Sequence, residues 1–168
     1  MKKILVILLP IITFAANAQE KHQLSIGAGY GDYDLKEEFD SVALLGWDAG
    51  HYSLGYGYNF SNNWMFELDY YDIEKGSVFE NSVFVTSARK TFDLSRRNRA
   101  YVKAGVNYYD FTLKGSFRNV NETGLNYAVG IGWQVDFDMG LSLSIELNKM
   151  KHSFIDSTFV DYSLSYRF

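Results

Sequence analysis

The sequence predicts an all-β protein: an eight-stranded antiparallel up-and-down transmembrane β-barrel. Eight extended segments alternate between apolar and polar residues, as strands with two unlike faces do. Long and short connections follow one another in turn, which is typical of a membrane barrel with two unlike ends. The last segment, 159–168, places Val160, Tyr162, Leu164, Tyr166 and Phe168 on one face. Together these observations favour a closed barrel with a membrane-facing exterior.

The first three expected strands, 22–34, 49–60 and 64–72, show the alternation in its simplest form. An acidic stretch, 35–48, separates the first two, whereas the Ser-Asn-Asn sequence at 61–63 has the composition of a tight turn. Large side chains therefore share one face of each strand. They are Leu24, Ile26, Ala28 and Tyr30; Tyr52, Leu54, Tyr56, Tyr58 and Phe60; and Trp64, Phe66, Leu68 and Tyr70.

The fourth expected strand, 82–92, is ambiguous because both of its faces mix apolar and polar residues. One face carries Phe84, Ala88 and Phe92 with Thr86 and Lys90, and we expect it to point outward. The opposite face carries Val83, Val85, Ser87 and Arg89. The fifth strand, 100–111, is clearer, with Val102, Ala104, Val106 and Tyr108 opposite Lys103, Gly105 and Asn107.

The sixth strand, 123–137, has the clearest pattern of the chain, and the seventh and eighth span 141–149 and 159–168. Polar connections precede the fourth, sixth and eighth strands at 73–81, 113–122 and 150–157, whereas 93–99 and 138–140 are short turns. The apolar residues of the sixth strand are Leu125, Tyr127, Val129, Ile131, Trp133, Val135 and Phe137, and those of the seventh are Leu141, Leu143, Ile145 and Leu147.

Residues 1–18 are typical of a secretory signal peptide. Lys2 and Lys3 precede a short apolar run, and Ala16-Asn17-Ala18 forms a small-x-small cleavage site. The barrel domain would then comprise 19–168. Removing Lys2 and Lys3 from the 16 basic residues leaves 14 against 20 acidic ones, a mature net charge of about −6.

Composition narrows the function classes. The chain has no cysteine, so disulfides and thiolate metal sites are excluded. Its three scattered histidines have no ligand spacing, and we expect neither metal nor cofactor. No stretch of the mature chain is apolar for long enough to form a membrane helix. The acidic balance argues against nucleic-acid binding.

Aromatic residues near strand ends decide which face meets lipid. They predict interfacial girdles, while the opposite face, rich in Gly, Ser and Asn, suits a narrow lumen better than the coat of a soluble barrel. The expected girdle is Tyr30, Tyr58, Phe60, Trp64, Tyr70, Tyr108, Phe137, Tyr166 and Phe168. We place the protein in a Gram-negative outer membrane, in contact with lipid and lipopolysaccharide.

Eight strands leave an interior that side chains can fill. Charges there must be paired, because an unpaired buried charge is costly. We expect Lys103 to bridge Glu67 and Glu146, with Arg167 nearby, and we favour this plug over an ion pathway. The expected polar network is Glu67, Asp69, Lys103, Gln134, Glu146 and Arg167.

Three sequence segments carry a family resemblance: Gly55-Tyr56-Gly57-Tyr58-Asn59-Phe60 followed by Trp64-Met65-Phe66-Glu67-Leu68, then Tyr101-Val102-Lys103-Ala104-Gly105-Val106-Asn107-Tyr108-Tyr109, and the ending Ser163-Leu164-Ser165-Tyr166-Arg167-Phe168. With the signal peptide, they resemble small outer-membrane barrels of the OmpX and OmpA-transmembrane-domain type, including Ail-like adhesion proteins. The resemblance implies that Tyr166 and Phe168 are the signal presented to the barrel-assembly machinery. It implies an anchor, adhesin, protective factor or minor pore.

Enzymatic chemistry is the main alternative to a surface role. Some eight-stranded barrels modify lipid A, and His51 and Ser53 have the His-x-Ser spacing of the deacylases. We expect this pair to face the lumen, and we see no assembled nucleophile, base and acid. The protein is therefore expected not to be an enzyme, with a narrow channel as the third hypothesis.

The connections are where function usually lies in such scaffolds. Apolar and charged residues there predict either self-packing loops or contacts with a host or matrix ligand. The candidate contacts are Phe39, Leu44, Trp47, Phe117 and Arg118. We expect the protein to act as a monomer.

Overall fold

A computed structural model describes residues 21–35, 47–75, 79–114, 119–152 and 155–168. The expected signal peptide, 1–18, lies outside these residues, as do Phe39, Leu44, Phe117 and Arg118. The described chain forms eight strands. They are β1 (His22–Leu35), β2 (Trp47–Ser61), β3 (Trp64–Lys75), β4 (Phe79–Asp93), β5 (Asn98–Lys114), β6 (Asn119–Asp136), β7 (Leu141–Lys151) and β8 (Ile155–Arg167).

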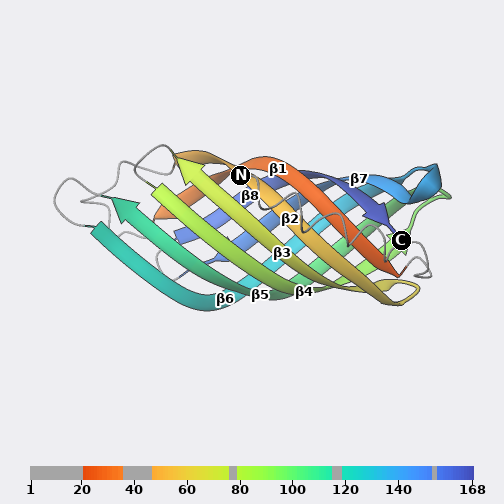
Figure 1. Ribbon diagram of the computed structural model, residues 1–168, viewed down its shortest axis with the longest axis horizontal. Helices are drawn as coiled ribbons and strands as arrows, with labels where there is room; N and C mark the ends of the chain where they lie inside the picture. The colour runs from red at the N-terminus through yellow and green to blue at the C-terminus, as the bar shows by residue number, and fades with distance from the viewer. Residues whose placement is uncertain (1–20, 36–46, 76–78, 115–118, 153–154) are drawn as a thin grey trace, which may run out of the picture.

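The strands close into a single barrel (Figure 1). Each strand pairs antiparallel with its neighbour in the chain, and β1 pairs with β8 from Gln23 opposite Arg167 to Leu35 opposite Ile155. Closure leaves no strand edge whose backbone groups would need other partners. The predicted fold class, an eight-stranded up-and-down barrel, is confirmed.

One end of the barrel, here called the turn end, carries the short connections. The β2–β3 turn lies there, as does the β6–β7 turn with the short 3-10 helix η3 (Asp138–Gly140). Phe168 is at the same end, and its carbonyl oxygen accepts a hydrogen bond from His22 N at 3.0 Å. Gly140 has φ of +79°, and a Cβ there would lie 2.6 Å from the Arg167 carbonyl oxygen. Glycine therefore suits this turn on both counts.

The opposite end, here called the loop end, differs from expectation. The polar segments 73–81, 113–122 and 150–157 were predicted to be connections, but strands fill most of them. Pairing continues to Lys75 opposite Phe79 and to Lys114 opposite Asn119. Backbone hydrogen bonds sustain a ladder whatever the side chains, so loss of the apolar pattern does not end a strand. Trp47, expected in a loop, begins β2.

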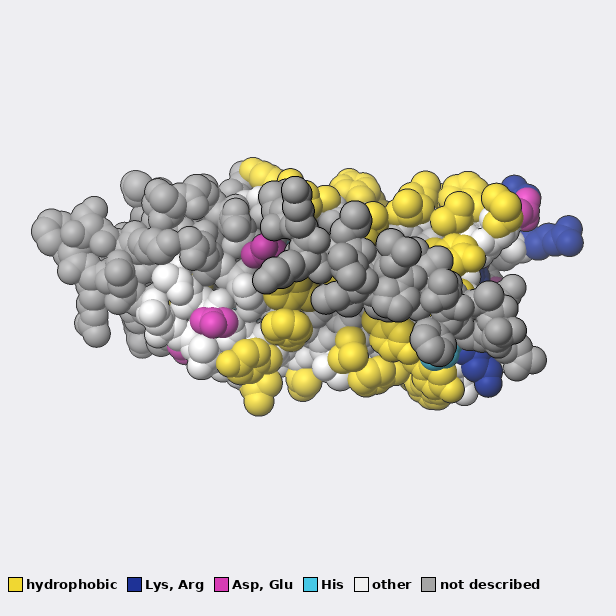
Figure 2. Space-filling model, in the orientation of Figure 1, with side chains coloured by type: hydrophobic (Ala, Val, Ile, Leu, Met, Phe, Trp, Pro, Cys, Tyr) yellow, Lys and Arg dark blue, Asp and Glu magenta, His cyan; other side chains and the backbone are white. Residues whose placement is uncertain are grey.

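The two faces of the sheet separate by chemistry. Large apolar side chains such as Leu125 and Ile131 are exposed on the outside, and Figure 2 shows hydrophobic side chains gathered over the middle and right of one face. On β4, Phe84, Ala88 and Phe92 are exposed and Val83 and Val85 are buried, which confirms the predicted face. None of the described residues forms a helix long and apolar enough to cross a membrane.

Candidate functional site

The interior nearest the turn end holds a network of charged side chains. Lys103 Nζ lies 2.5 Å from Glu146 Oε1 and 3.3 Å from Asp69 Oδ2. Arg89 Nη1 donates to Glu67 Oε1 at 3.0 Å. Each of these charges therefore has an oppositely charged partner on a neighbouring part of the barrel wall, as burial requires.

The pairing of Lys103 corrects the sequence-based expectation. We expected Lys103 to bridge Glu67 and Glu146, but its second carboxylate is Asp69, and Glu67 pairs with Arg89. Glu67 and Asp69 both point inward from β3, and the stagger between strands decides which of them meets Lys103. That stagger cannot be read from one sequence.

Arg89 is the residue that sequence reasoning missed. It bonds Glu67, donates to the Gln134 side-chain oxygen, and lies 3.5 Å from the centre of the Tyr101 ring. A guanidinium can make these contacts at once because it has five donors and a planar face. The signal was its place on the inward face of β4 with Val83 and Val85, since an inward cation requires an acid nearby.

A second cluster closes the interior at the turn end, around Asp136. Its Oδ1 accepts hydrogen bonds from Arg167 at 2.6 Å, Gln134 at 2.7 Å and Ser142 at 2.8 Å. Arg99 also pairs with this carboxylate. Arg167 was expected near Lys103, but the ion pair the structure gives it is with Asp136, at the mouth of the barrel.

His51 and Ser53 both point inward, and both contact Asp161 of β8. His51 Nε2 lies 2.9 Å from Asp161 Oδ1, and Ser53 Oγ donates to the same oxygen at 3.0 Å. In a hydrolytic triad the histidine stands between the acid and the nucleophile, whereas here the acid stands between the other two. The three residues are in contact without the order that nucleophilic catalysis needs.

Glycines on β1 make room for this contact. A Cβ on Gly27 would lie 2.3 Å from Ser53 Oγ, and one on Gly29 would lie 2.4 Å from the His51 ring. Both distances are far below a normal contact. A side chain at either position would therefore displace the His51–Asp161–Ser53 group.

The interior nearest the loop end holds an apolar cluster, together with the buried polar side chains of Asn81, Asn107 and His152. Phe159 packs edge-on against His51 and Tyr71, with ring centroids 4.6 and 5.4 Å apart. Ile73 and Val83 are fully buried close by. The cluster is Ala49, Tyr71, Ile73, Val83, Val85, Tyr109, Phe111, Ala128, Met150 and Phe159. The sequence had suggested a polar filling throughout.

A polar cavity of about 30 Å³ lies among Glu67, Arg89, Lys103 and Asp161, roughly the volume of one water molecule. Within the described parts of the chain, no group of His, Cys, Asp and Glu side chains could hold a metal ion.

The expected girdle residues lie on the outside; Tyr58, Phe60, Trp64 and Tyr166 are near strand ends, whereas Tyr30, Tyr70 and Tyr108 lie nearer the middle of their strands. Tyr30, Tyr58, Phe60, Trp64, Tyr108, Phe137 and Tyr166 are exposed, and Tyr70 and Phe168 are half-buried. Stacked pairs link some of them, including Phe60 with Trp64 and Tyr166 with Phe168. Their role as membrane anchors stays a prediction.

Comparison with known proteins agrees with this architecture. The structure resembles Neisserial surface protein A (TM-score 0.69, 14% identity, covering 88% of this chain and 97% of that one). It also resembles Ail, the attachment invasion locus protein of Yersinia pestis (TM-score 0.61, 18% identity, 88% and 99%). A third similar structure is the N-terminal barrel of Pseudomonas aeruginosa OprF (TM-score 0.62, 16% identity, 86% and 97%).

At these identities the likeness is one of fold. No curated protein sequence matches the chain. The family model described as "Outer membrane protein beta-barrel domain" matches residues 4–168, nearly the whole sequence. The chain therefore belongs to the outer membrane β-barrel family, whose members are proteins of the bacterial outer membrane.

Proposed function

We propose that this protein is a non-enzymatic surface protein of the outer membrane, in which a sealed barrel anchors a functional loop end. The observation that carries the proposal is the filled interior. Lys103 and Arg89 have carboxylate partners, and beyond them Phe159 and Tyr71 pack in an apolar cluster. This arrangement leaves the segments at the loop end as the place for adhesion or envelope protection.

Two ion pairs followed by an apolar cluster support a sealed interior. An ion entering from the turn end would have to separate Arg167 from Asp136 and then Lys103 from Glu146. It would next meet the apolar cluster around Phe159 and Ile73, where the desolvation of an ion is costly. A cavity the size of one water does not offer a hydrated path.

Conductance in planar bilayers tests the seal. We expect the refolded protein to produce no steady single-channel steps, with a wide porin as the positive control. Steady steps that change on Glu67→Gln or Lys103→Met would show an ion pathway through the network and would overturn the sealed-barrel proposal.

The enzyme hypothesis makes a separate prediction. Ser53 and His51 both bond Asp161 and lie inside the barrel, away from lipid substrates. We therefore expect Ser53→Ala to leave the lipid A of producing cells unchanged by mass spectrometry. A lipid A species that depends on the chain and disappears in Ser53→Ala would establish lipid A modification instead.

The loop end is the proposed contact surface. Ail, a structural neighbour, has been solved with the heparin analogue sucrose octasulfate. The connection 36–46 of this chain carries Glu37, Glu38 and Asp40, and its negative charge would repel such a polyanion. We propose that the protein instead contacts a neutral or basic host or matrix surface.

Replacing 36–46 with a short turn tests this role. Binding of producing cells to basic matrix proteins should fall to background, while heat-modifiable migration on a gel shows that the barrel still folds. The variant Glu37→Gln/Glu38→Gln/Asp40→Asn, which removes the acidic charges and keeps the length of the connection, serves as the matched control for charge. Unchanged binding after loop replacement would exclude this connection as the contact site.

A further inference from the structure

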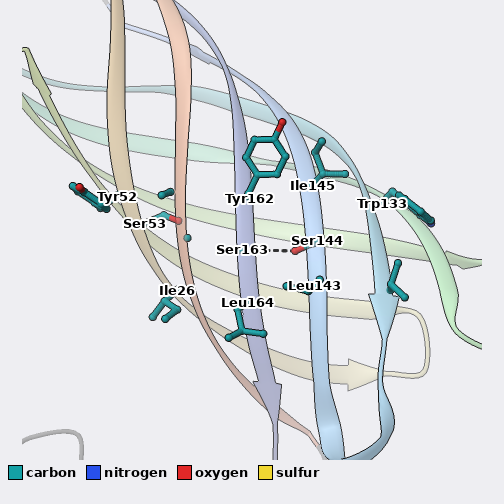
Figure 3. A pocket seen from close by; sticks show the side chains of 13 residues that line it. Ile26, Tyr52, Ser53, Trp133, Leu143, Ser144, Ile145, Tyr162, Ser163 and Leu164 are labelled. Carbon is teal, nitrogen blue, oxygen red and sulfur yellow. Dashed lines mark hydrogen bonds between the residues drawn. The ribbon is translucent and has the colours of Figure 1, made fainter.

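A groove crosses the outside of the barrel over β6, β7, β8, β1 and β2 (Figure 3). Its volume is about 850 Å³. One wall is a row of outward side chains on successive strands: Tyr52, Tyr162, Ile145 and Trp133. Strand pairing fixes this row, since Trp133 lies opposite Ile145, Ile145 opposite Tyr162, and Ala28 between Tyr162 and Tyr52.

The second wall runs parallel to the first, two residues along each strand. Val135 lies opposite Leu143, Leu143 opposite Leu164, and Leu164 opposite Ile26. The two rows are therefore separated by one step of the period-two alternation, about 7 Å. Large side chains occupy both rows on β7 and β8, and the space between the two rows is the groove.

The floor of the groove is backbone, because the residues between the rows point into the barrel. Their hydroxyl groups make hydrogen bonds there. Ser163 Oγ and Ser144 Oγ lie 2.7 Å apart, and Ser53 Oγ donates to Asp161. Because these serines point inward, the groove presents mainly apolar walls, which suit a hydrocarbon ligand.

The middle of β4 and β5 lacks such walls. On β4 and β5, Ala88 lies opposite Ala104, and Thr86 lies opposite Val106. All of these residues point outward, but three of the four are too small to enclose a ligand. The groove is thus a local feature of the exterior and not a general property of the barrel surface.

The direction of the groove suits one leaflet of a bilayer. Crossing five strands covers about 19 Å. Because strands of such barrels tilt by about 35–45°, a line across them rises by about 13 Å along the membrane normal. Half of a hydrocarbon core is about 15 Å. A chain in the groove would therefore traverse about one leaflet.

We propose that this groove binds one acyl chain of a membrane lipid in preference to the rest of the barrel surface. We infer an acyl chain because the groove is continuous with the lipid-facing surface and its walls are apolar. The inference depends on membrane placement and not on the role of the loops. A second copy of this chain is the competing occupant.

Native mass spectrometry tests the proposal on barrels extracted from bilayers of palmitoyl-oleoyl phosphatidylglycerol. We expect one retained lipid per wild-type chain. Tyr162→Ala/Leu164→Ala removes both walls at β8 and should lower the retained fraction about tenfold, by loss of packing contacts. The matched control, Phe66→Ala/Leu68→Ala on β3, should retain lipid like the wild type.

Equal loss in both variants, no retained lipid in the wild type, or a wild-type dimer that the β8 variant abolishes would each overturn the proposal. Heat-modifiable migration identifies variants that fail to fold. A second measurement leaves the groove of the probed chain intact. It follows the quenching of Trp133 fluorescence by brominated phosphatidylcholine in a Trp47→Phe/Trp64→Phe chain, where Trp133 is the remaining tryptophan. The comparison chain carries Trp133→Phe as well and has its one tryptophan at Ala104→Trp, outside the groove. Trp133 should be quenched more strongly than this tryptophan, and equal quenching would contradict a preferred groove.

Discussion

The two halves of the barrel interior differ in what holds them together: ion pairs in one, mainly apolar packing in the other. Near the turn end, Arg89 and Lys103 are held among carboxylates, and near the loop end Phe159 and Ile73 pack in an apolar cluster. The charged half depends on pairwise satisfaction, so each member is costly to lose alone. The apolar half depends on shape and volume, so the cost of a change follows the atoms removed.

Of the substitutions that distinguish the charged half from the apolar half, Lys103→Met should lower the free energy of unfolding most. It leaves Asp69 and Glu146 buried without their cation, which should lower the free energy of unfolding by about 4 kcal/mol. Urea unfolding in lipid vesicles, followed by Trp fluorescence, measures the loss.

The control for Lys103→Met neutralises its partners as well. Lys103→Met/Asp69→Asn/Glu146→Gln leaves no unpaired charge and should recover most of the stability. If the triple variant is as unstable as the single one, the Lys103 stem matters through packing, and the charged half resembles the apolar half.

Phe159→Ala should come second, at about 3 kcal/mol, because it opens a cavity beside Tyr71 and His51. The same unfolding experiment measures it. Phe84→Ala is the matched control, since that ring is exposed on the outside of the barrel. Equal losses for the two phenylalanines would mean that the apolar half is not a packed cluster.

Arg167→Met should have the smallest effect, about 1 kcal/mol, because Asp136 keeps Arg99, Gln134 and Ser142 and the site is partly exposed. Salt should weaken this effect and leave that of Lys103→Met nearly unchanged. Unfolding at low and high salt concentration checks the difference. A loss as large as that of Lys103→Met would extend the charged half to the mouth of the barrel.

The sequence predicted the strands well because each alternation is local. Tyr162 and Leu164 face outward and Asp161 and Ser163 inward whatever lies beside them. The strand ends near the loop end were wrong, because polar segments such as 113–122 keep pairing after the apolar pattern stops. The β4 face, uncertain from its composition, follows once Phe84 is placed in contact with lipid.

The sequence could not predict which inward side chains contact one another. Lys103, Glu67 and Glu146 were placed on the right face, but the partner of Lys103 depends on the stagger of five strands that one sequence does not reveal. The apolar cluster was missed for another reason. Phe111, Met150 and Phe159 lie in or beside segments that were assigned to connections, so their inward direction was not considered.

The continued pairing of β5 and β6 determines how far the barrel extends beyond the hydrocarbon. Strands of 17 and 18 residues, tilted as in such barrels, rise by about 40 Å, against an apolar band about 25 Å tall. About 15 Å of paired sheet therefore stands clear of the hydrocarbon, stiffened by its own ladder (Figure 1). Whatever the loop end contacts is met at that height above the hydrocarbon and not at its surface.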